Sequence, residues 1–75
     1  MIQKYSVLIA GHRTSISLEP EFMAELKKIA AKRNMPVAAL ITEIDAHRAL
    51  DMKHAGGLSS ALRVFVLNSL IKPEL

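Results

Sequence analysis

The fold of this chain is constrained most by a short segment of alternating polar and apolar residues that is followed closely by a proline. Residues 13–18, Arg-Thr-Ser-Ile-Ser-Leu, alternate between a polar face with one arginine and two serines and a largely apolar face, which predicts a half-buried strand. Pro20 then favours the first turn of a helix, where its missing amide needs no partner. Everything after Pro20 has helical periodicity. We therefore expect one lone strand in the chain, whose partner strand comes from a second copy.

Three helices are predicted after this strand. The spacing of apolar residues predicts helices over residues 20–33, 36–50 and 59–71. Asn34 tolerates the left-handed conformation that closes many helices, so we expect it to end the first helix. Ser59 or Ser60 is the expected cap of the third. The third helix has little polar surface, which predicts burial against the other helices and a partner subunit. Residues 1–12 are expected to form an N-terminal arm or an extra strand.

The composition favours one small domain, residues 1–75, stabilised by dimerisation. A domain of this size buries only about 60% of its unfolded surface, and the chain has no cysteine for a disulfide or a thiolate metal site. The net charge of +3 and the pI of about 9.6 favour an anionic partner such as nucleic acid. No apolar run approaches the length that spans a bilayer, so we expect a cytoplasmic protein that does not bind membranes.

Residues 14–22, Leu26, residues 29–30 and residues 40–41 together resemble the ribbon-helix-helix superfamily of Arc- and MetJ-type repressors. Three blocks, residues 11–19, 43–45 and 58–67, more specifically resemble an uncharacterised bacterial branch of that superfamily. The resemblance implies a mainly helical, intertwined homodimer in which residues 13–18 of each chain form a two-stranded antiparallel ribbon, with an extra C-terminal helix. It also implies a sequence-specific DNA-binding protein, a repressor or autoregulator, whose ribbon reads the major groove of double-stranded DNA. Such dimers can associate further on DNA.

The resemblance assigns DNA contacts to two regions of the chain. The outward ribbon residues, expected to contact bases, are Arg13, Ser15 and Ser17. The residues expected to contact the DNA backbone, at and before the start of the second helix, are Lys32, Arg33, Asn34, Met35 and Val37. The chain departs from typical members here, because Met35-Pro36 offers no serine or threonine to cap the second helix. The competing interpretation of the ribbon face is an ordinary solvated strand face.

Two alternative functions remain open at this stage. The dimer can be repurposed as a small-molecule-binding module, or as a protein-interaction, antitoxin-like module in which the third helix binds a partner. The polar residues that can form an effector pocket are Glu43, Asp45, Arg48, Ser59, Ser60 and Arg63. The simpler interpretation of this cluster is structural: an Asp45–Arg48 pair within the second helix and a salt bridge from Arg63 that fastens the third.

No catalytic, cofactor or metal site is expected. Glu43 and His47 are four residues apart and share a helical face, but two ligands do not make a metal site. Ser59 and Ser60 lack the Ser-His-Asp order and the oxyanion motif of a nucleophilic enzyme. The sequence therefore predicts a non-enzymatic protein without a cofactor.

Overall fold

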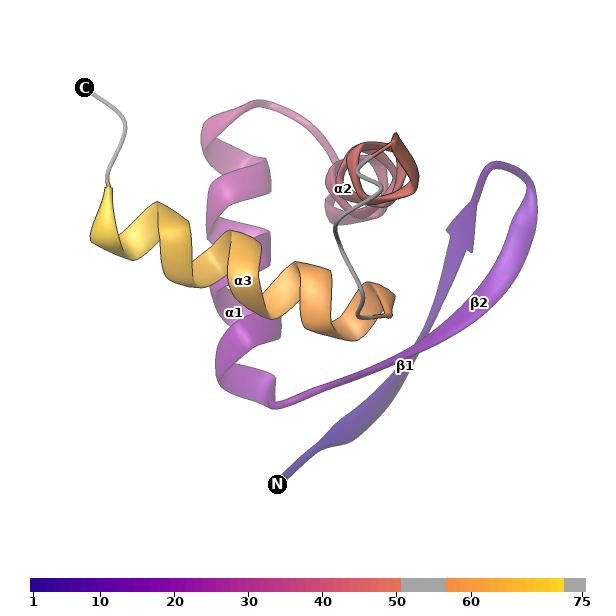
Figure 1. The fold of residues 1–75 in the computed structure, drawn as a ribbon, viewed down its shortest axis with the longest axis horizontal. Helices are drawn as coiled ribbons and strands as arrows, with labels where there is room; N and C mark the ends of the chain where they lie inside the picture. Colours follow the sequence, from indigo (N-terminus) through magenta and orange to yellow (C-terminus); the bar gives the residue numbers. More distant parts are fainter. Residues whose placement is uncertain (51–56, 73–75) are drawn as a thin grey trace.

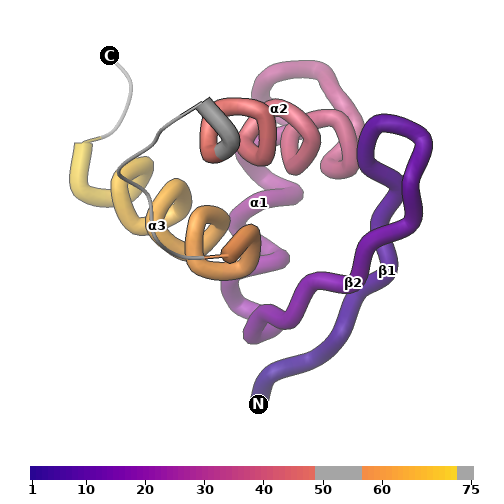
Figure 2. Tube along the Cα trace, turned by 45° about the vertical axis from the view of Figure 1, so that its right-hand side comes forward, coloured from indigo at the N-terminus to yellow at the C-terminus, as the bar shows by residue number. Residues whose placement is uncertain are grey.

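A two-stranded hairpin and three helices make up the fold (Figure 1). The computed structural model describes residues 1–50 and 57–72. The elements in chain order are β1 (Gln3–Ile9), β2 (His12–Leu18), α1 (Pro20–Lys32), α2 (Val37–Leu50) and α3 (Leu58–Ile71). The hairpin lies along one side of the helices (Figure 2). Within the described residues, no helix has the length and apolar character needed to cross a membrane.

The expectation of a lone strand is wrong, because β1 pairs with β2 inside the chain. The two strands run antiparallel, with Ser6 opposite Ser15 and Ile9 opposite His12. They are joined by two residues with positive φ, Ala10 at 50° and Gly11 at 81°. Positive φ at both central residues gives the tight turn whose twist matches that of the strands it connects. The N-terminal segment thus supplies an extra strand rather than a free arm.

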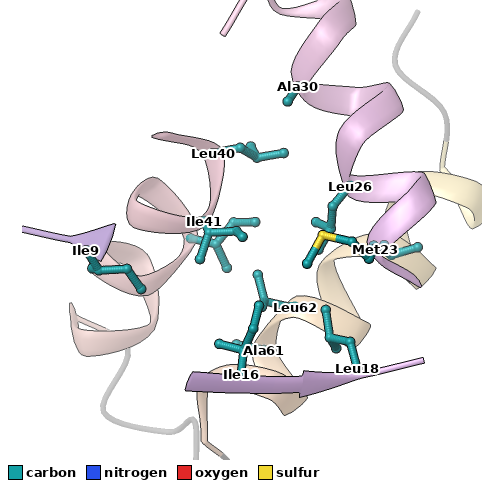
Figure 3. Close-up of a cluster of buried hydrophobic side chains, with 12 residues drawn as sticks. Ile9, Ile16, Leu18, Met23, Leu26, Ala30, Leu40, Ile41, Ala61 and Leu62 are labelled. Carbon is teal, nitrogen blue, oxygen red and sulfur yellow. The ribbon is translucent and has the colours of Figure 1, made fainter. Parts of the chain in front are cut away.

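The hairpin turns its apolar face onto the helices (Figure 3). Ile16 and Leu18 of β2 are almost completely buried and share one cluster with Leu62 of α3. Burial of an aliphatic side chain of this size contributes about 1.5–3 kcal/mol relative to leaving it exposed. The other buried members of the cluster are Ile9, Met23, Leu26, Ala30, Leu40, Ile41, Ile44, Ala61 and Val66. All five elements therefore contribute to a single core.

The end of α1 confirms the prediction made for Asn34. This residue has φ of 55°, in the left-handed region. Its amide donates to the Ala31 carbonyl at 3.1 Å, and the Met35 amide donates to the Ala30 carbonyl at 3.0 Å. These two bonds satisfy carbonyls that the end of a helix otherwise leaves without a partner. The chain can then reverse direction and enter α2 within a few residues.

The third helix, α3, is buried on one face only. Ala61, Leu62 and Val66 face the core. The large apolar side chains that remain 44–62% exposed on this helix are Val64, Leu67, Leu70 and Ile71. The elements of its own chain therefore cover only one side of α3, and the predicted burial of its other side against a partner subunit stays a prediction.

Candidate nucleic-acid interface

The outward face of the hairpin carries the polar ribbon residues identified from the sequence. Arg13 and Ser15 are exposed and Ser17 is half-buried. Directly paired residues of antiparallel strands project to the same side of the sheet. The β1 residues beside them are Leu8 opposite Arg13, Ser6 opposite Ser15 and Lys4 opposite Ser17. The first strand therefore lies beside β2 and widens this face without covering it.

Sequence reasoning missed Lys4 and Ser6 as members of this face. Both side chains are exposed. The signal was present in the β-prone segment that precedes Gly11, but only the register of the pairing shows which of its residues share a side with Arg13. We call the six residues Lys4, Ser6, Leu8, Arg13, Ser15 and Ser17 the hairpin face.

The hairpin is positively charged. Residues 1–18 include Lys4, His12 and Arg13 but no aspartate or glutamate. The first carboxylate in the chain, that of Glu19, already accepts a hydrogen bond from Arg63 Nε at 3.0 Å. An anion that approaches the hairpin face thus meets two permanent positive charges and several hydroxyl groups, and no carboxylate from the hairpin itself.

The first turns of α3 hold the end of β2. The Ser17 amide donates to Ser59 Oγ at 3.0 Å, and Arg63 Nη2 donates to the Ser17 carbonyl at 3.2 Å. The predicted capping role of the α3 serines is therefore wrong, since Gly57 is the N-cap and no side chain caps the helix. Ser59 instead accepts a strand amide. Strand and helix are tied together at this point by two hydrogen bonds between distant parts of the sequence.

The carboxylate of Glu19 completes this junction. Two hydrogen bonds lower the pKa of Glu19 from its ordinary value of 4.5: the larger effect comes from a backbone hydrogen bond, and the next from the side-chain hydrogen bond with Arg63. The Arg63 guanidinium also lies 5.9 Å from the centroid of the Phe22 ring in α1. The arginine thus contacts β2, the residue before α1, and α1 itself.

Beyond Ser17, the edge of β2 that faces away from β1 has no hydrogen-bonded neighbour within the described chain. The amide and carbonyl of Ser17 point away from β1, toward α3. Backbone groups two and four residues earlier on a strand point the same way. The amides and carbonyls of Arg13 and Ser15 therefore face outward, and none of the described residues provides them with a hydrogen-bond partner. An edge of this kind can pair with another strand.

The second helix, α2, packs against β1 of the hairpin (Figure 2). Val37 is the first residue of α2, and no backbone acceptor for its amide is found in the described part of the chain. The amides of Asn34 and Met35, which were also expected to contact DNA, instead close the end of α1. Of the backbone groups named from the sequence, the Val37 amide is thus the one left available.

The structure places Lys32 and Arg33 away from the hairpin face, beside α3. Both line a groove together with Phe65. The Arg33 guanidinium lies 5.7 Å from the centroid of the Phe65 ring and 3.6 Å from the Glu43 carboxylate. Both cations thus line the groove beside α3, although they lie close to the start of α2 in sequence.

The polar residues considered as an effector pocket do not gather in one place. Asp45 and Arg48 form the expected pair within α2, at 2.6 Å. Glu43 faces Arg33, whereas Ser59 and Arg63 bind the end of β2. The remaining member is Ser60, which is half-buried in α3. Across residues 1–50 and 57–72, no three His, Asp or Glu side chains are placed to share a metal ion.

Comparison with known proteins gives a family match and a similar solved structure. A family model described as ribbon-helix-helix domain matches residues 2–70. The solved structure of an uncharacterized protein from Bordetella pertussis Tohama I is similar, with a TM-score of 0.81 and 31% sequence identity over 95% of this chain. The chain covers 57% of that structure's length. No curated protein matches the sequence.

Proposed function

The chain belongs to the ribbon-helix-helix domain family, and from this we propose that it is a dimeric, sequence-specific DNA-binding transcription regulator, a repressor or autoregulator, that acts in the bacterial cytoplasm. The observation that carries the proposal is the hairpin face, which presents Arg13, Ser15 and Lys4 to solvent on a hairpin without a carboxylate. Phosphates are attracted by such a surface, and bases can be read by the arginine fork and the hydroxyls.

Dimerisation in this proposal uses the open edge of β2. The groups of Ser17 are already bonded to α3, so the free edge groups are those of Arg13 and Ser15. If the amides and carbonyls of both residues pair between two antiparallel β2 strands, Arg13 of one chain lies opposite Ser15 of the other. The two β2 strands then lie at the centre of a four-stranded sheet, with a β1 strand on each flank.

The contacts with DNA follow from this arrangement. Arg13 can donate two hydrogen bonds to the O6 and N7 atoms of a guanine, and Ser15 can donate to or accept from any base. The free amide of Val37 at the start of α2 can donate to a phosphate, where the positive end of the helix dipole adds to the attraction. Pro36 supplies neither an amide nor a capping oxygen, so anchoring of the DNA backbone here depends on main-chain amides of the first turn, such as that of Val37.

DNA binding is tested by fluorescence anisotropy with duplexes selected from a randomised pool. Arg13→Ala should weaken binding to the selected duplex strongly. Lys28→Ala is the matched control, because it removes the same charge from an exposed α1 side chain that pairs with Glu25, at 3.2 Å. Affinity should fall with salt by a slope of about −0.9 for each phosphate contact. If the wild type does not bind at about 50 mM salt, where such contacts are strongest, the proposal fails. Equal losses in the two variants also count against it.

The dimer is tested by analytical ultracentrifugation of two proline variants. Ser15→Pro removes an amide from the open edge of β2, so it should convert the dimer to a monomer. Ser6→Pro is the matched control, because Ser6 lies directly opposite Ser15 and its amide points away from β2. This variant should remain a dimer. Identical assembly of the two variants would refute pairing along this edge.

A further inference from the structure

A groove of about 610 Å³ lies between the C-terminal halves of α1 and α3. This volume is in the range of sites that hold small molecules, about 300–1,000 Å³. In Figures 1 and 2, the C-terminal half of α3 lies on the side of the helices away from the hairpin. The groove is therefore separate from the hairpin face, and it shares no residue with the effector cluster named from the sequence.

The groove combines an apolar wall with positive charge. Ile29 and Phe65 are half-buried against the core and form the wall. The charged groups are Lys32, Arg33 and Lys72, and none of the described acidic residues lines the groove. The Arg33 guanidinium lies over the Phe65 ring, 5.7 Å from its centroid. The groove thus contains a cation–π interaction between the flat Arg33 guanidinium and the Phe65 ring.

The three cations are poorly neutralised by the rest of the described chain. Neither Lys32 nor Lys72 forms an ion pair within residues 1–50 and 57–72. Arg33 has Glu43 at 3.6 Å, but both side chains are nearly half exposed, 45% and 49%. Ion pairs with this much exposure are weak because water screens them. Like charges gathered around one groove repel each other, and a bound anion relieves that repulsion.

We propose that this groove is a binding site for a small aromatic carboxylate. The ring of the ligand lies against Phe65 and Ile29, and its carboxylate accepts hydrogen bonds from Lys32, Arg33 and Lys72. Arginine and lysine both bind carboxylates well, because their charge-assisted hydrogen bonds to a carboxylate are stronger than neutral hydrogen bonds. The exposed Asn68 amide at the groove wall can donate a further hydrogen bond.

The proposal is tested by isothermal titration calorimetry of the full chain with 2-naphthoate. Two further probes separate charge from shape: 2-naphthamide has the same rings without the charge, and acetate has the charge without the rings. The groove variant is Lys32→Gln with Lys72→Gln. Its matched control is Lys27→Gln with Lys28→Gln, which removes the same charge from exposed positions that do not line the groove. Circular dichroism confirms that all variants are folded.

We expect one naphthoate per chain, with a Kd at least about tenfold tighter than that of naphthamide or acetate. The groove variant should bind naphthoate at least about tenfold more weakly, the change expected when charge-assisted hydrogen bonds are removed, and the control should match the wild type. Absence of naphthoate binding overturns the proposal, as does equal binding of naphthamide or an unchanged Kd in the groove variant. Arg13→Ala should lose DNA affinity and keep naphthoate binding, so the outcome does not depend on the DNA-binding proposal.

Discussion

The hairpin turn can be tested by replacing Gly11 with alanine. Gly11 has φ of 81°, a conformation that L side chains rarely adopt. A Cβ atom at this position would meet nothing within 4 Å. The replacement therefore introduces backbone strain without a steric clash with neighbouring residues. Because the strain exists only if the turn forms, Gly11→Ala reports directly on whether β1 folds back onto β2.

The expected loss of stability is about 1 kcal/mol. A left-handed conformation costs an L-residue about 1–2 kcal/mol relative to the right-handed region. Alanine also restricts the unfolded chain more than glycine does, which offsets about 0.4–1 kcal/mol of that cost. In a domain of this size, a change of about 1 kcal/mol lowers Tm by about 4–8 °C.

The measurement is thermal unfolding followed by circular dichroism, with all variants at one protein concentration because the Tm of a dimer depends on concentration. Gly57→Ala is the control. Gly57 has φ of −80°, and a Cβ atom there also meets nothing within 4 Å. Its Tm should stay within about 2 °C of the wild type, since a weaker N-cap and a more restricted unfolded chain oppose each other. An unchanged Tm for Gly11→Ala, or an equal loss in both variants, would refute the turn.

Two further predictions concern the core and the junction at Glu19. Leu62→Ala should destabilise the fold by about 2–5 kcal/mol in urea unfolding, because Leu62 is completely buried; Leu67→Ala, at a 52% exposed position of the same helix, should change the free energy of unfolding by less than about 0.5 kcal/mol. The pKa of Glu19 is lower in the folded state than its ordinary 4.5, so its ionised form stabilises the fold above pH 4.5 and this contribution is lost as the pH falls through the folded-state pKa. The difference in unfolding midpoint between the wild type and Glu19→Gln should therefore be larger at about pH 7 than at about pH 3, and a difference independent of pH would contradict the assignment.

The sequence was informative where local chemistry decides the structure. Pro20 predicts the start of α1 because its fixed φ suits a first helical turn, and the structure begins the helix there. Asn34 predicts its end for an equally local reason. The alternation in residues 13–18 likewise identifies the buried side chains of β2, Ile16 and Leu18. In each of these three cases, the conformational preference of one residue or the periodicity of a short segment is sufficient to predict the local structure.

Features that depend on distant partners were not predictable in the same way. The turn at Ala10-Gly11 lacks the asparagine or aspartate that marks tight hairpins, so the pairing of β1 with β2 was missed. The bonds from Ser59 and Arg63 to Ser17 join residues 42 and 46 positions apart. Arg33 was assigned to DNA because it is close to α2 in sequence, whereas its contact with Phe65 depends on the packing of α3 on α1. Sequence spacing carries no information about these pairs.

The paired β1 strand makes a specific prediction about how the proposed dimer binds DNA. Four strands spaced by about 4.8 Å span about 14 Å between the outermost strand axes, which exceeds the major-groove width of about 12 Å. The two central β2 strands can therefore enter the groove, while the flanking β1 strands meet the phosphates.

The two cations of the hairpin face should then have different roles. Lys4, on β1, should contact phosphate, so Lys4→Ala should weaken binding to all duplexes about equally and reduce the salt slope by about 0.9 for each phosphate that is no longer neutralised. Arg13, on β2, should contact bases, so Arg13→Ala should reduce discrimination at one base pair by about 1–3 kcal/mol. Anisotropy titrations against selected and unrelated duplexes at several salt concentrations measure both quantities. If Lys4→Ala reduced discrimination as much as Arg13→Ala does, β1 would have to enter the groove, and the sheet could not have the four-stranded form proposed for the dimer.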